Sequence, residues 1–80
     1  MTWGPWSTDI DGAERRARLR AMRALALVHC RYEKNFINTL RQAEIDDTAL
    51  PVAFTELGKL PPLRRRHLLA TYVQLVGGSQ

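Results

Sequence analysis

From Ala13 to Leu50 the sequence contains neither glycine nor proline, the two residues that most often interrupt a helix. The region predicts one uninterrupted α-helix over about residues 11–46. Such a helix would be about 50 Å long at a rise of 1.5 Å per residue. The chain is therefore expected to be all-α and to be built around this helix.

The expected helix has a start signal but no strong internal stop signal. Asp11 with Glu14 three residues later is a weak match to a capping box. A break near Asn35 or Asn38 is the alternative, although neither residue is a strong helix breaker.

An apolar face follows the helical repeat along this segment, because its members recur at steps of three and four. They are Ala21, Leu25, Val28, Tyr32, Phe36, Leu40 and Ala43. The mixture is not the Ile/Leu heptad of a long coiled coil, so packing of a globular kind is expected. We predict that the larger members form the core or a dimer face: Leu25, Val28, Tyr32, Phe36 and Leu40.

The opposite face of the same helix carries a basic stripe, which we define as Arg16, Arg20, Arg23 and Arg31. Residues 15–31 contain six arginines and no acid. The stripe is predicted to bind a partner, either acidic side chains of a protein or the phosphates of a nucleic acid. The remaining alternative is a solvated face whose arginines pair within the chain, with Glu14, Asp46 or Glu56.

Two shorter helices are expected after the long one. The first covers about residues 49–57, with Asp46 and Asp47 ahead of it and Pro51 in its first turn. The second, of about fifteen residues, starts at Pro61-Pro62. The predicted fold is a helical hairpin or three-helix unit over residues 11–76, with an arm at 1–10 and a tail at 77–80.

Three consecutive arginines, residues 64–66, fall in the first turn of this last helix. Cations are mildly unfavourable at that end of a helix dipole. They are expected either to contact a partner or to pair locally with Glu56 or with Asp46 and Asp47.

The chain has 80 residues, so it forms at most one domain with a modest core. The apolar face of a helix over residues 11–46 is longer than residues 49–76 could cover. We therefore expect a homodimer.

The N-terminal arm holds two tryptophans, Trp3 and Trp6. Exposed tryptophan leaves a large apolar area in water, so the arm has two interpretations. Either it folds back onto the core, which is the favoured alternative, or the tryptophans anchor a partner, as tryptophan often does at binding hot spots.

Catalytic and metal-binding patterns are weak. His29, Cys30 and His67 are the only soft metal ligands, and adjacent side chains on a helix do not converge. No phosphate-binding glycine loop or catalytic triad pattern occurs. We expect no enzyme activity, no catalytic residue, no metal and no cofactor.

Composition and hydropathy predict the cellular location of the protein. The longest apolar run is too short to cross a bilayer, so no membrane partner is expected. A single cysteine without a partner fits a reducing cytoplasm. Ten of the twelve basic residues are arginine, a bias typical of GC-rich bacterial or phage genes.

These observations favour a small non-enzymatic regulator, inhibitor or adaptor that binds another protein through a helical surface. The alternative is a nucleic-acid-binding regulator that uses the basic stripe. The stripe lacks asparagine or glutamine before Asn35, and these residues read base edges, so specific DNA recognition is disfavoured.

Overall fold

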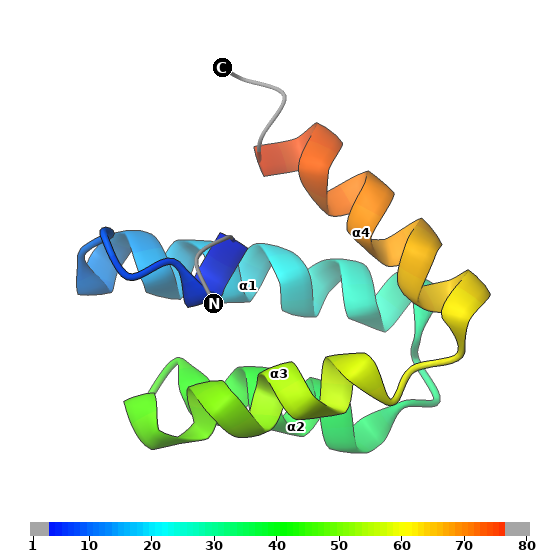
Figure 1. The fold of residues 1–80 in the computed structure, drawn as a ribbon, viewed down its shortest axis with the longest axis horizontal. Helices are drawn as coiled ribbons and strands as arrows, with labels where there is room; N and C mark the ends of the chain where they lie inside the picture. The colour runs from blue at the N-terminus through cyan, green and yellow to red at the C-terminus, as the bar shows by residue number, and fades with distance from the viewer. Residues whose placement is uncertain (1–3, 77–80) are drawn as a thin grey trace.

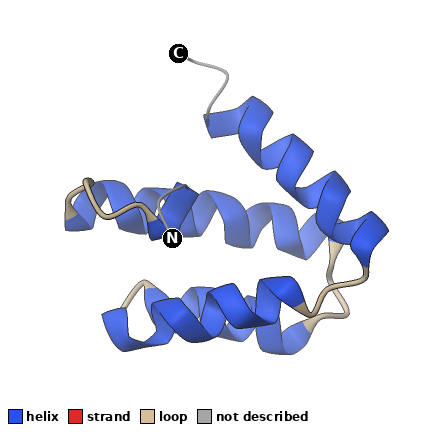
Figure 2. Cartoon of the chain, in the orientation of Figure 1, coloured by secondary structure: helices blue, strands red, loops and turns tan. Residues whose placement is uncertain are grey.

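The computed structural model describes residues 4–76, in which helices are joined by loops and no strand occurs (Figure 2). The all-α prediction is therefore confirmed. The elements in chain order are the 3-10 turn η1 (Gly4–Trp6), α1 (Gly12–His29), α2 (Lys34–Ala43), the 3-10 turn η2 (Asp47–Ala49), α3 (Leu50–Gly58) and α4 (Pro62–Val76).

Helix α1 is the centre of the fold. It packs against α4 on one side and against α2 on the other, and α3 packs on α2 (Figure 1). The principal extents of the molecule are 30 × 29 × 19 Å. An uninterrupted helix of about 50 Å could not fit within them.

The prediction of one long helix is wrong, because the chain turns at residues 30–33. The amide of Cys30 still donates to the Ala26 carbonyl at 2.7 Å, and Glu33 then donates to Cys30 at 2.9 Å, which closes a turn. Helix α2 restarts without a side-chain cap at Glu33. The turn ends two residues before Asn35 and five before Asn38, the two alternative sites.

Burial explains why the helix breaks there. The turn lets the apolar side of α2 meet the apolar side of α1 within the same chain. The buried residues brought together are Leu19, Met22, Ala26 and Cys30 with Phe36, Leu40 and Ala43. Each large apolar side chain removed from water contributes about 1.5–3 kcal/mol, more than the few helical hydrogen bonds lost at the turn.

The predicted core residues divide at this turn. Phe36 and Leu40 are buried as expected, and Leu25 is partly buried against the core. Val28 and Tyr32 are 72% and 69% exposed, so their assignment to the core of the single chain is wrong. Tyr32 lies in the turn that interrupts the helical repeat, and Val28 lies in α1, whose buried side carries Leu19, Met22 and Ala26 instead. The place of Val28 and Tyr32 in a dimer face stays a prediction.

Local signals predicted the starts of α1, α3 and α4. Asp11 Oδ1 accepts from the Glu14 amide at 2.7 Å and caps α1. Asp46 Oδ1 accepts from the Thr48 amide at 3.0 Å and caps η2. This hydrogen bond lowers the pKa of Asp46. Helices α3 and α4 begin within one residue of the expected positions.

The N-terminal arm packs on the helices. Trp6 is buried, its ring meets Phe54 edge-on at 5.3 Å, and its Nε1 donates to the Leu50 carbonyl at 2.9 Å. Arg15 donates to the carbonyls of Pro5 and Ser7, and Arg18 donates to that of Gly4. Trp6 is thus a core residue of the free chain and not an exposed anchor. Trp3 lies outside the described residues.

Candidate interaction surfaces

An uncovered mixture of apolar and cationic side chains runs along α1 and into the turn after it. We call it the α1 surface and define it by six exposed residues: Arg16, Arg20, Leu27, Val28, Arg31 and Tyr32. Four of them fall within residues 27–32, where one side of the last turn of α1 faces solvent. Exposure of neighbouring large apolar residues is typical of a contact surface.

Arg31 and Tyr32 form a small preorganised unit on this surface. The Arg31 Nη2 donates to the Tyr32 hydroxyl at 3.0 Å, and the guanidinium carbon lies 5.0 Å from the ring centroid. Both the hydrogen bond and the cation–π contact restrict two side chains that would otherwise be mobile. Less conformational entropy is then lost when a partner binds them.

The basic stripe does not act as one continuous charge. Glu44, the residue after α2, forms ion pairs with two of its members. Its Oε1 accepts a hydrogen bond from Arg20 at 3.1 Å, and its Oε2 lies 3.0 Å from the guanidinium of Arg23. The Glu44 side chain is only 9% exposed, so these arginines neutralise a largely buried carboxylate. The expected internal pairing therefore occurs, but with an acid that the sequence did not indicate.

The acids named as internal partners are used differently. Glu14 pairs with Arg18 at 2.8 Å, and Glu56 pairs with Lys59 at 3.2 Å. Within residues 4–76, Arg16 and Arg31 make no ion pair. Of the four stripe residues, these two keep their charge available to a partner.

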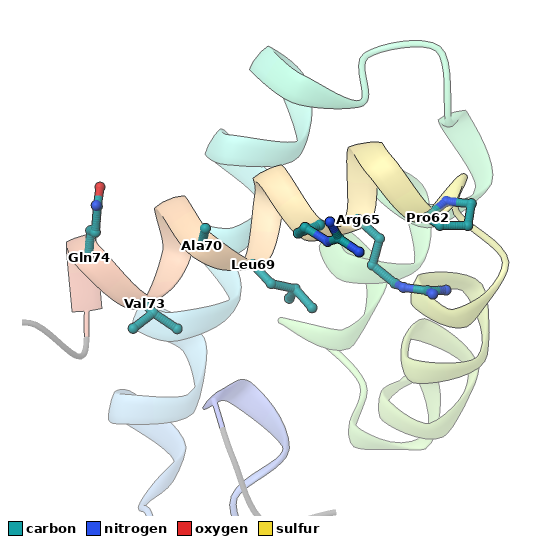
Figure 3. A pocket seen from close by; sticks show the side chains of 7 residues that line it. Pro62, Arg65, Leu69, Ala70, Val73 and Gln74 are labelled. Atoms are coloured by element: carbon teal, nitrogen blue, oxygen red, sulfur yellow. The ribbon is translucent and has the colours of Figure 1, made fainter.

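The second candidate surface is an open groove along α4, with a volume of about 710 Å³ (Figure 3). We call it the α4 groove. It is lined by one face of the helix: Pro62, Arg65, Arg66, Leu69, Ala70, Val73 and Gln74. Sequence reasoning missed it, although the signal was present. Apolar residues occur on more than one face of α4, and a helix that packs on one neighbour buries only one of them.

The arginine triplet does not pair as either local prediction expected. None of Arg64, Arg65 and Arg66 forms an ion pair with another residue of the described range. Arg65 Nη1 donates instead to the Gly58 carbonyl at 2.9 Å, at the end of α3. The first turn of α4 thus keeps its positive charge.

The soft ligands do not come together. Within residues 4–76, no three His, Cys, Asp or Glu side chains lie close enough to hold a metal ion. Cys30 is a buried free thiol, and its pKa is raised by burial and by the nearby Glu33 carboxylate. A raised pKa keeps a thiol protonated and poorly nucleophilic.

In the described part of the chain, no helix combines the length and the apolar character needed to cross a bilayer. Comparison with protein-family models, with curated proteins and with solved structures finds no match for this chain.

Proposed function

We propose that the protein is a small non-enzymatic interaction domain, a regulator, inhibitor or adaptor, that binds another protein through the α1 surface. The observation that carries the proposal is the cluster at residues 27–32. There, the fold leaves Leu27 and Val28 exposed, next in the chain to an arginine whose guanidinium lies over the ring of exposed Tyr32. Tyrosine and arginine are enriched where protein interfaces bind most tightly, and exposed apolar neighbours exclude water around them.

Charge favours a protein partner over a nucleic acid. Phosphate backbones need an unbroken positive track, whereas Glu44 neutralises Arg20 and Arg23 in the middle of the stripe. Leu27 and Val28 also offer nothing to a phosphate. A partner that presents one or two carboxylates beside an apolar patch would match Arg16, Arg31 and these side chains. We place this interaction in the cytoplasm, since Cys30 is a free thiol.

A second copy of the chain is the other protein that could cover this surface. The apolar face of an unbroken helix, which predicted a homodimer, does not exist, because the chain turns at residues 30–33. Val28 and Tyr32 still provide an exposed apolar area that two copies could share. Sedimentation of the purified chain at tens of micromolar separates the two cases, because without another protein present only self-association can form a larger species.

The test is affinity capture from nuclease-treated extract, with three baits compared by quantitative mass spectrometry. One bait is unchanged, one carries Val28→Glu, and the control carries Val52→Glu on α3, which is also exposed. We expect a protein that the unchanged bait and the control retain and the Val28 variant loses. Retention by all three baits, or loss of every partner after nuclease treatment, would contradict the proposal.

A further inference from the structure

The α4 groove is a surface distinct from the one assigned above, and it shares no residue with it. Helix α4 is held on the fold by Leu68 and Tyr72, which are buried. The groove residues follow one another at steps of three and four, so they occupy a neighbouring face that no other element of the described chain lines. Leu69 also packs against the core and Arg65 bonds to the Gly58 carbonyl, whereas the groove residues Arg66 and Val73 are exposed and can be changed without disturbing the anchors of the helix.

We propose that the α4 groove binds an acidic amphipathic helix of a partner protein. The side chains along the groove change from cationic to apolar. Arg65 and Arg66 lie near the start of α4, and the apolar side chains Leu69, Ala70 and Val73 follow. Gln74 comes last, toward the end of the helix (Figure 3). A helix with carboxylates near one end and an apolar stripe beyond them matches this order.

Charge complementarity indicates that the partner is negatively charged where it meets the groove. Sequence positions 57–80 contain Lys59 and three arginines but no acid. No carboxylate in the first turn of α4 offsets either these cations or the positive end of the helix dipole. Carboxylates of a partner would offset both the cations and the helix dipole, since arginine binds carboxylate by paired hydrogen bonds.

The length and openness of the α4 groove indicate that the partner binds as a helix. The lining residues extend from 62 to 74, which is about 18 Å of helix or three turns. A groove this long and open fits one side of a helix of similar length better than an enclosed small molecule. Two or three apolar side chains of such a helix, spaced by three and four residues, would lie on Leu69, Ala70 and Val73.

The apolar part of the groove also distinguishes this partner from a nucleic acid. A phosphate backbone would engage Arg65 and Arg66, yet it would gain nothing from covering Leu69 and Val73. A partner should therefore need both its carboxylates and its apolar side chains, and removing either set should weaken its binding to the groove.

The probe is a fluorescein-labelled helical peptide of about fifteen residues. It carries leucines at steps of three and four and glutamates near its N-terminus. One comparison peptide replaces the glutamates with glutamine, and another replaces the leucines with serine. Fluorescence anisotropy with the full chain should give a dissociation constant in the micromolar range for the acidic amphipathic peptide and at least about tenfold weaker binding for both others.

The chain offers matched pairs of variants. Val73→Ser changes a groove residue, and Leu75→Ser changes one of similar exposure outside it (56% and 61%). Arg66→Gln and Arg64→Gln form the corresponding pair of exposed arginines. The two groove variants should weaken peptide binding by roughly tenfold and the two controls by less than about twofold. Circular dichroism must show that all four variants keep their helix content.

Several outcomes would overturn the proposal. They are equal binding of the serine-substituted peptide, equal loss in the groove and control variants, an oligonucleotide that binds the groove in place of the peptide, and sedimentation in which Val73→Ser abolishes self-association. Val28→Glu on α1 should leave peptide binding unchanged. A loss there would contradict this proposal without affecting the one for the α1 surface, whose own failure would leave the peptide result intact.

Discussion

The indole of Trp6 donates to the carbonyl oxygen of Leu50, 44 residues later in the chain, at a distance of 2.9 Å. The same ring meets Phe54 edge-on. Through these two contacts, an arm that precedes the first long helix becomes part of the packing of the third. The arm is therefore expected to contribute to the stability of the whole fold.

Trp6→Ala should lower the free energy of unfolding by about 3–5 kcal/mol, because it removes a buried aromatic ring from a small core. Trp6→Phe keeps most of the ring and loses the hydrogen bond, so its cost should be smaller than that of alanine. Urea denaturation followed by circular dichroism measures both, with the exposed substitution Thr8→Ala as control. A loss below about 0.5 kcal/mol for Trp6→Ala would show that the arm does not belong to the core.

Replacing Arg20 and Arg23 together by glutamine should destabilise the fold by about 1–3 kcal/mol. The reason is that the largely buried Glu44 carboxylate would lose both of its cationic partners. Adding Glu44→Gln should restore part of the loss, whereas Arg16→Gln alone should change stability by less than about 0.5 kcal/mol. Thermal and urea unfolding of these three variants and of the unchanged protein check this. An unchanged double variant would mean that the two ion pairs are structurally unimportant.

Stability should fall at high pH through Tyr72, whose pKa burial raises to about 12 from its ordinary value near 10. The unfolded chain ionises this phenol first, so the contribution of Tyr72 is complete below pH 10 and is lost as the pH rises toward 12. Tyr72→Phe removes this part of the pH dependence. Unfolding free energies of the two proteins at pH 9 and pH 11 provide the comparison. Parallel changes in both would show that Tyr72 does not titrate with folding.

The Cys30 thiol should resist alkylation in the native protein, because it is buried and its pKa is raised. Iodoacetamide at pH 8 should label it slowly in buffer and rapidly in denaturing urea. A Cys30→Ser, Thr8→Cys variant places the single thiol at an exposed position and supplies the control. Equal labelling rates for the two native proteins would contradict the burial of Cys30.

The sequence predicted features that depend on neighbouring residues and missed features that depend on contacts between separate helices. Asp11, Asp46 and Pro62 act on residues next to them, and the starts of α1 and α4 were predicted to within one residue, whereas the end of α1 and the turn η2 were not predicted. The turn after Cys30 has no such local signal. It exists because Phe36 and Leu40 bury themselves against α1, a contact that only the folded chain contains.

The same distinction between local signals and distant contacts applies to the candidate surfaces. Arg16 and Arg31 are exposed as their pattern indicated, because a run of basic residues on a helix rarely faces a core. The pairing of Arg20 and Arg23 with Glu44 joins separate helices and could not be foreseen. Tyr32 was assigned to the apolar face only by continuing a helical repeat through the turn.

The most direct test of the account is the salt dependence of binding to the protein captured through the α1 surface, measured by isothermal titration calorimetry at 50 and 200 mM salt. An interface that combines apolar contacts with one or two ion pairs should lose less than about tenfold in affinity over this range. Val28→Glu should weaken binding at both concentrations. A fall of about a thousandfold or more, with Val28→Glu behaving like the unchanged protein, is the result expected for a chain that neutralises phosphates, and it would contradict the account.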